Sequence, residues 1–289
     1  MQANKADRHR ILFDWLGIAP FMLFALMFLI IPTLYLVTGA FQDAEGNVTL
    51  VNIAGLFTDK IMSSFSISIR ISIASAIGGI LLGFYLAWAL VLGGLPPALR
   101  GAVMTFCGVA SNFAGVPLAF AFLATLGRLG LITMVLRDWF GFNLYASGFN
   151  LLSFTGLTLT YMYFQIPLMV LIITPALEGL RKEWREAAES LGASHFQYWT
   201  KVALPILFPS IAGAFMLLFA NAFGAIATAY SLTGSSLNIV PIQLYAQIRG
   251  DVLHNANLGY ALAFGMIVVT GISNLIYITL RVRAERWQK

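Results

Sequence analysis

Long apolar runs alternate with short polar segments along this chain. Six runs contain no Asp, Glu, Lys or Arg, at 15–42, 71–99, 101–127, 139–177, 202–248 and 252–280. An apolar helix needs roughly 20 residues to cross a bilayer, so each run is long enough for one crossing. The runs are continuously apolar and do not alternate, which predicts helices rather than a membrane β-barrel. The pattern therefore predicts an all-α, polytopic membrane protein.

We expect one transmembrane domain over 15–280, with a polar lead (1–14) and a polar tail (281–289). The predicted helices span about 15–37, 67–92, 99–126, 151–177, 206–232 and 260–280. The first helix is retained, since its apolar part exceeds the roughly 7–15 residues of a cleaved signal peptide. External connections are expected at 39–66, 128–149 and 233–258, the first and last with a short helical piece.

Two local patterns refine the helices. Gly79 and Gly83 have the GxxxG spacing that permits close helix approach. Pro167 and Pro175 are expected to break or kink the fourth helix, because proline lacks the N–H that a helix needs.

Composition agrees with a membrane protein and narrows the chemistry. Charged residues make up 10% of the chain, against about 25% in a soluble domain. The single cysteine, Cys107, allows no intrachain disulfide or cysteine-based metal cluster, and the three histidines have no ligand spacing. No Gly-x-x-x-x-Gly-Lys-Ser/Thr phosphate loop occurs. We predict no catalytic residue and no metal site, and we expect any energy from ATP to come from another subunit.

The distribution of Lys and Arg predicts the sidedness. With a cytoplasmic N-terminus, twelve of these residues lie in inner segments and four in outer ones. The inner set is Lys5, Arg8, Arg10, Arg100, Arg181, Lys182, Arg185, Lys201, Arg281, Arg283, Arg286 and Lys289; the outer set is Lys60, Arg128, Arg137 and Arg249. This bias predicts cytoplasmic termini and a cytoplasmic loop at 178–205. The net charge of +5 thus reports orientation rather than a nucleic-acid partner.

The loop at 178–205 carries helix signals. Trp184, Ala187, Ala188 and Leu191 follow the i, i+3, i+4, i+7 spacing of one helix face, and Gly192 comes where a helix end favours glycine. A second helix is expected to begin at a capping box and to be interrupted before the next apolar run. Ser194 and Gln197 have the capping-box spacing, and Pro205 discourages an unbroken continuation.

The same loop resembles the EAA loop of ABC importer permeases that work with a binding protein. The match rests on Glu-Ala-Ala, three residues, Gly, nine residues, an aliphatic residue, one residue and Leu-Pro. The matching positions are Glu186, Ala187, Ala188, Gly192, Val202, Leu204 and Pro205. The resemblance implies a type I ABC importer permease fold, in which the short helix is a coupling helix that docks on a cytoplasmic ATPase. An amphipathic helix lying at the membrane surface is the alternative reading.

Membership of that family implies several partners. These are ABC ATPase subunits carrying ATP and Mg²⁺, a second permease subunit that is a copy or a homologue, and an extracytoplasmic solute-binding protein. Trp184, Glu186 to Ala188, Leu191, Gly192, Leu204 and Pro205 are then the expected ATPase-coupling residues, in a bacterial inner-membrane protein without a cofactor of its own.

Polar side chains within the apolar helices are candidates for a translocation path. We expect Asn112, Thr160, Gln165 and Asn221 to line it; Ser111 and Asn274 are further candidates. Each has the alternative of a hydrogen bond that merely joins two helices. No Asp or Glu lies deep in a predicted helix, which disfavours an ion-coupled secondary transporter.

The solute is the least constrained prediction. The chain looks most like the branch that handles spermidine/putrescine, ferric iron and small solutes such as phosphonates, and polyamine is the solute expected. A secondary transporter or channel, or a membrane scaffold without transport, are rival classes, and neither explains the spacing in the loop.

Overall fold

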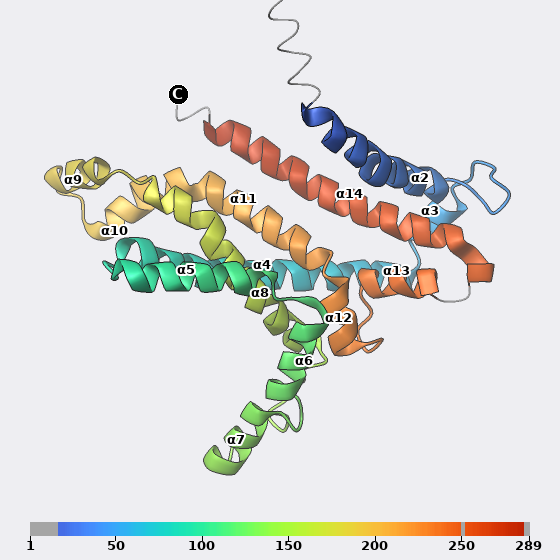
Figure 1. Ribbon diagram of the computed structural model, residues 1–289, viewed down its shortest axis with the longest axis horizontal. Helices are drawn as coiled ribbons and strands as arrows, with labels where there is room; N and C mark the ends of the chain where they lie inside the picture. Colours follow the sequence, from blue (N-terminus) through green and yellow to red (C-terminus); the bar gives the residue numbers. More distant parts are fainter. Residues whose placement is uncertain (1–16, 250–251, 286–289) are drawn as a thin grey trace, which may run out of the picture. The chain divides into compact units, whose positions relative to one another are not determined.

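The computed structural model describes residues 17–249 and 252–285 (Figure 1). These residues form helices and no β-sheet; one isolated bridge pairs Gln42 with Val48. Six helical stretches are long and apolar enough to cross a membrane: Gly17–Ala40, Asp59–Leu92, Gly115–Phe140, Phe154–Glu178, His195–Phe223 and Asn257–Thr279. The predicted all-α, six-span membrane fold is confirmed. The lead at 1–14 lies outside the described residues.

The helices are more numerous than the apolar runs. They are η1 (Leu26–Ile30), α2 (Ile31–Ala40), α3 (Val51–Gly55), α4 (Asp59–Leu92), α5 (Pro97–Asn112), α6 (Gly115–Leu126), α7 (Leu131–Phe140), α8 (Phe154–Glu178), α9 (Lys182–Ser190), α10 (His195–Tyr198), η2 (Trp199–Ala203), α11 (Leu204–Phe223), α12 (Ile226–Thr233), α13 (Val240–Arg249) and α14 (Val252–Glu285). The η elements are π-helical turns.

Two predicted helices are broken. The run predicted as one helix at 99–126 divides into α5 and α6 at residues 113–114, and the run at 206–232 divides into α11 and α12 at residues 224–225. Gly115, with φ of +74°, has a backbone conformation that favours glycine. The connection predicted at 128–149 also contains a helix, α7.

The expected breaks at the prolines are absent, and the alternative of a kink at Pro167 or Pro175 stays a prediction. α8 continues through Pro167 and Pro175, and the chain stays helical through Pro205. Each proline removes only one main-chain donor, and helices in apolar surroundings accommodate such a loss by local adjustment. Before Pro205 the adjustment is visible as the π-turn η2, Trp199–Ala203. The prediction of an interruption at Pro205 is therefore wrong, and a change of helical pitch stands in its place.

The chain divides into two compact units, 59–245 with 268–289 and 1–58 with 246–267. The larger unit is organised around α8, which is more buried than any other candidate span. α8 packs against α4, α5 and α11, and its contact with α4 is the most extensive helix pair.

Small residues on α4 permit this close packing. A Cβ added at Gly79 would lie 2.9 Å from the Cβ of Gln165, and one at Gly83 would lie 2.6 Å from the Cβ of Met169 and 2.7 Å from the carbonyl oxygen of Ile166. The predicted close approach of a helix at Gly79 and Gly83 is confirmed, with α8 as the partner.

The smaller unit joins the end of the first span to the first half of α14. Gly39 lies against the ring of Tyr260, where an added Cβ would be 2.6 Å from Cδ2. The side-chain amides of Asn52 and Asn257 each donate to the carbonyl oxygen of Gln42, at 2.7 Å. α14 contributes its remaining residues to the larger unit.

Candidate functional site: an exposed helical loop and a cavity at two helix breaks

The helix α9 presents its side chains to the surroundings. No residue of α9 is buried, and within the larger unit α9 and α10 lie at one end (Figure 1). Trp184 is exposed, and just beyond the helix Leu191 and Phe196 are 89% and 76% exposed. Arg185 donates to the carboxylate of Glu189 at 2.8 Å along the exposed surface of α9, and this contact raises the pKa of Arg185. A helix with such an exposed apolar face has a surface suited to a partner.

The corner after α9 has the conformation predicted from its glycine. Gly192 has φ of +78°, and its N–H donates to the carbonyl of Glu189 at 2.9 Å. The N–H of Ala193 donates to the carbonyl of Ala188 at 3.0 Å. These two bonds form the Schellman motif that ends a helix on a left-handed residue. The corner thus holds α9 in a fixed direction relative to the next helix.

The restart of the helix is also as predicted. The N–H of Ser194 donates to Oε1 of Gln197 at 2.8 Å, and the N–H of Gln197 donates to Oγ of Ser194 at 3.3 Å. This reciprocal pair is a capping box.

An aromatic contact joins this loop to the helix bundle. The indole N–H of Trp199 donates to Nε2 of His195 at 3.1 Å. The Trp199 ring meets Trp88 of α4 edge-on, with 6.4 Å between ring centroids. Trp199 begins the π-turn that leads into α11, so the loop is continuous with one spanning helix and in contact with another.

Charged residues at this end of the unit pair with one another. Arg100, at the start of α5, forms an ion pair with Glu178, the last residue of α8. Both residues were predicted to lie near the inner membrane surface. The structure brings them to the end of the unit that carries α9. Lys60, predicted to lie on the outer side, has a different neighbour: its main-chain carbonyl oxygen accepts a hydrogen bond from the side-chain amide of Asn238 at 3.0 Å.

The two helix breaks lie together and border a cavity of about 380 Å³. The N–H of Gly115, directly after the first break, donates to the hydroxyl of Thr228 at 2.7 Å. The hydroxyl of Tyr161, on α8, donates to the carbonyl oxygen of Ala225, in the second break, at 2.8 Å. The cavity is lined by Ser111, Ala114, Gly115, Phe164, Ala220, Asn221, Gly224, Ala225, Ile226, Ala227 and Thr228. Interrupted helices expose main-chain polar groups that water or a solute can meet.

The predicted path residues lie in different surroundings. Asn221 lines this cavity, and so does Ser111. Asn112, at the end of α5, is exposed and donates to the carbonyl of Gly108 at 2.9 Å. Gln165 is 0% exposed and donates to Oγ of Ser75 at 2.7 Å between α8 and α4. Thr160 is likewise buried and donates to the carbonyl of Gly156 at 2.9 Å.

The geometry therefore separates the four predicted path residues. Gln165 and Thr160, both on α8, are buried between helices, and their role in a path stays a prediction. The two helix breaks were not predicted; Gly115 and Gly224 were the available signals, hidden within continuous apolar runs. Among the described residues, no three His, Cys, Asp or Glu side chains lie close enough to hold a metal ion.

Known proteins resemble this chain in sequence. The chain is 29% identical over 198 residues to the molybdenum transport system permease protein ModB of Escherichia coli K12, covering 67% of this chain and 82% of ModB. It is 29% identical over 119 residues to the spermidine/putrescine transport system permease protein PotC of the same organism, covering 41% of this chain and 44% of PotC. It is 27% identical over 169 residues to the putative ferric transport system permease protein FbpB 1 of Haemophilus influenzae, covering 56% of this chain and 26% of that protein. No protein-family model matches the chain.

Solved structures share the fold. A bacterial ABC transporter involved in the import of the acidic polysaccharide alginate contains a chain that superposes with a TM-score of 0.74 at 18% identity, covering 96% of this chain and 98% of that one. A second structure of the alginate transporter, in complex with an alginate pentasaccharide-bound periplasmic protein, gives a TM-score of 0.70 at 19% identity, covering 96% of both chains. The chain has the fold of an ABC importer permease.

Proposed function

We propose that this protein is the membrane-spanning permease subunit of an ATP-driven importer of the ABC class, located in the bacterial inner membrane with both termini cytoplasmic. The observation that carries the proposal is α9, a helix with no buried residue that ends on a left-handed glycine. Its position at one end of a multi-span bundle suits a lever that a separate subunit moves. The permease names of the sequence relatives and the shared fold support the same conclusion.

The proposed partners follow from this role. The exposed apolar face of α9 would dock on a cytoplasmic ATPase subunit, which would carry ATP and Mg²⁺, and the present chain would hydrolyse nothing. A second permease and an extracytoplasmic binding protein complete the assembly. The alginate transporter, a fold relative, was solved with a periplasmic protein, which supports the last of these.

Replacement of Gly192 tests the proposal. Gly192→Val places a β-branched side chain at φ of +78°, a conformation that such residues rarely adopt. Solute uptake and solute-stimulated ATPase activity are expected to be lost while the protein still inserts and spans the membrane. Gly148→Val is the matched control, because Gly148 also has positive φ (+94°) and an added Cβ there meets nothing within 4 Å. Normal uptake by Gly192→Val would contradict the proposed role of the corner.

A crosslink tests the partner directly. Cys107 is the single cysteine, so Cys107→Ala gives a background in which Ala187→Cys is the sole reactive site. Its crosslinks are expected to join the ATPase subunit in the assembled transporter. Crosslinks to lipid alone would instead favour an amphipathic helix at the membrane surface.

The solute belongs to one of a few classes. Polyamine, predicted from the sequence, is named in one relative, while molybdenum and ferric iron are named in others. Ligand screening on the associated binding protein, followed by uptake of spermidine, molybdate and ferric iron into vesicles, would distinguish them. Uptake by the permease alone, driven by an ion gradient without an ATPase, would indicate a secondary transporter.

A further inference from the structure

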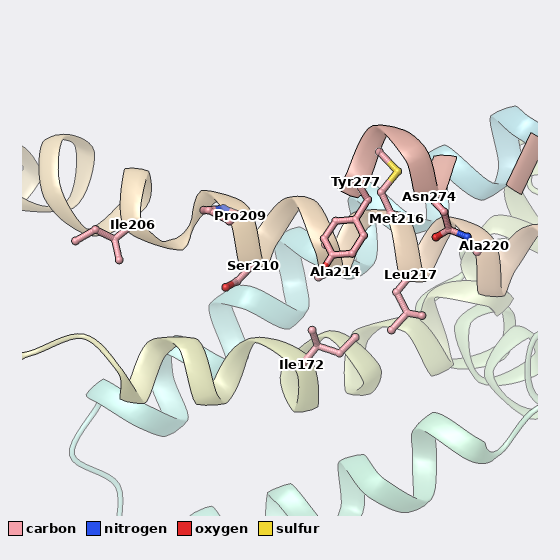
Figure 2. Close-up of a pocket in the computed structure, with 11 residues that line it drawn as sticks. Ile172, Ile206, Pro209, Ser210, Ala214, Met216, Leu217, Ala220, Asn274 and Tyr277 are labelled. Carbon is pink, nitrogen blue, oxygen red and sulfur yellow. The ribbon is translucent and has the colours of Figure 1, made fainter. Parts of the chain in front are cut away.

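A groove between α11 and α14 carries polar side chains that have no visible partner. The groove has a volume of about 680 Å³ and lies within the larger unit (Figure 2). Its lining residues come from α8, α11 and α14, and most are apolar. Three polar side chains line it as well: Ser210, Asn274 and Tyr277.

None of these three side chains makes a hydrogen bond within the part of the chain that the structure describes. Ser72 and Thr160, by contrast, each donate to a carbonyl oxygen one turn back, at 2.8 and 2.9 Å. Lipid tails offer no hydrogen bonds, so an unpaired polar group that faces them is costly. Three such groups in one groove indicate that the groove faces water, a solute or polar groups of a partner.

Glycine at one position shapes the groove. A Cβ added at Gly213 would lie 2.7 Å from Cε2 and 3.2 Å from the hydroxyl oxygen of Tyr277. The absence of a side chain on α11 thus allows the Tyr277 ring to lie against it, with its hydroxyl on the groove. Next to this contact, the hydroxyl of Ser273 on α14 donates a hydrogen bond to Sδ of Met216 on α11, at 2.9 Å.

The groove and the cavity at the helix breaks share one lining residue. Ala220 lines both, and the groove is also bordered by Ile206, directly after Leu204 and Pro205 of the loop. Residues that line one hollow or the other therefore occur along α11 from Ile206 to the second break. The volume of the groove lies in the range of small-molecule sites, about 300–1,000 Å³.

The chemistry of the lining selects among solutes. Among the residues that the structure describes, no charged side chain lines the groove or the cavity at the helix breaks, so a solute would be held there by hydrogen bonds. Ser210, Asn274 and Tyr277 each supply a donor, which suits oxygen acceptors, and each also supplies an acceptor, so it is the lack of a carboxylate among the described lining residues that disfavours a cation. An ammonium group supplies only donors, and a site for it would gain from a carboxylate.

We propose that the α11/α14 groove is a solute-binding site in the translocation path, which holds an oxygen-bearing solute by hydrogen bonds from Ser210, Asn274 and Tyr277. An oxyanion and a hydroxylated molecule share this chemistry. The proposal rests on the proposed function and adds the place and the chemical class of binding.

Thiol labelling in the assembled transporter tests whether the groove is wet. In the Cys107→Ala background, Ser210→Cys and Asn274→Cys are expected to react with a charged, water-soluble methanethiosulfonate. The matched controls Phe208→Cys and Leu275→Cys, on the same two helices, are exposed but do not line the groove, and are expected not to react. Lack of reaction at both groove positions would overturn the proposal, since lipid or a partner helix would then fill the groove.

Uptake separates the solute classes. Molybdate, sulfate and a neutral oligosaccharide represent the oxygen-bearing class, and spermidine represents the cationic class. Tyr277→Phe and Ser210→Ala are expected to raise the KM for the transported oxygen-bearing solute by about three- to ten-fold, the size of one or two lost hydrogen bonds, and that solute is expected to protect Ser210→Cys from labelling. Thr279→Val is the control, because Thr279 donates to the carbonyl of Ile276 and does not line the groove.

Two results would overturn the proposal without touching the proposed function. One is transport of spermidine with no transport of the oxygen-bearing probes, and the other is an unchanged KM in both groove variants. In either case, intact solute-stimulated ATPase activity would show that the chain still works as a permease. If the unmodified transporter showed no solute-stimulated ATPase activity, the proposed function itself would be contradicted.

Discussion

The α4/α8 pair and the α11/α14 groove both contain polar side chains in apolar helices, yet their surroundings differ. Between α4 and α8, Gln165 donates to Ser75, and glycines bring the two helices into contact. Between α11 and α14, Ser210 and Asn274 line an open hollow and pair with nothing in the described part of the chain. The same kinds of residue therefore pair between α4 and α8, whereas Ser210 and Asn274 line a hollow between α11 and α14.

This difference shows what a polar residue in a membrane helix indicates. Its presence alone does not mark a path, because a hydrogen bond between helices uses the same side chains. The informative property is whether the protein itself supplies the partner. An exposed group without a partner in the protein must be satisfied by something outside the subunit, whereas Oε1 of Gln165 is buried and has no hydrogen-bond partner among the described residues.

The largest expected effect comes from adding a side chain between α4 and α8, here called the closed pair because the two helices are in direct contact. Gly83→Leu would place a large side chain where even a Cβ lies 2.6 Å from Met169. We expect the α4/α8 pair to separate and the protein to fail to accumulate, because overpacking by even a few atoms costs about 1–3 kcal/mol. Yield in the membrane and thermal unfolding in detergent measure this. Gly101→Leu, where nothing lies within 4 Å of an added Cβ, should accumulate normally.

A smaller change in the open groove should affect transport rather than folding. Gly213→Ala displaces the Tyr277 ring, which can move into the hollow. We expect uptake to fall by about ten-fold, or roughly 1.4 kcal/mol, with an unfolding temperature close to that of the unmodified protein. Gly271→Ala is the control on α14, since an added Cβ there meets nothing within 4 Å. Equal uptake in the two variants would mean that the groove does not carry solute.

The sequence predicted some of these features and missed others, for physical reasons. Local features were accessible: the six apolar spans, the left-handed Gly192 and the capping box at Ser194 depend on residues close together in the chain. The breaks at 113–114 and 224–225 were missed, because they lie within unbroken apolar runs and hydropathy does not report backbone continuity.

Long-range pairing was out of reach as well. The partner of Gln165 is Ser75, 90 residues away, and the residues that border the groove come from three helices far apart in the sequence. Gln165 and Asn221 are alike as amides within apolar runs. Only the fold shows that one is enclosed and the other lines a cavity.

Removal of one partner in the closed pair should affect stability and spare transport. Ser75→Ala leaves the side-chain amide N–H of Gln165 buried without an acceptor. We expect the free energy of unfolding to fall by about 1–3 kcal/mol. Adding Gln165→Leu removes the orphaned amide and should restore much of that loss. Thermal unfolding of the single and double variants measures the coupling, and no coupling would mean that the bond does not join the helices.

Thr160→Val should have the smallest effect and gives the strictest test of the comparison. Thr160 was predicted to line the path, but its hydroxyl is buried and donates to the carbonyl of Gly156. Valine has nearly the same shape, and in the variant that carbonyl keeps its main-chain bond within α8, so no buried group loses its last partner. We expect uptake to stay within about two-fold of the unmodified protein and stability to change by less than about 1 kcal/mol. Asn221→Val, made beside it, removes a side chain that lines the cavity at the breaks and should reduce uptake further. If Thr160→Val reduced uptake as strongly as Asn221→Val, a buried, hydrogen-bonded side chain and a cavity-lining one would have equal influence on transport, and the distinction between enclosed and cavity-lining polar residues would fail.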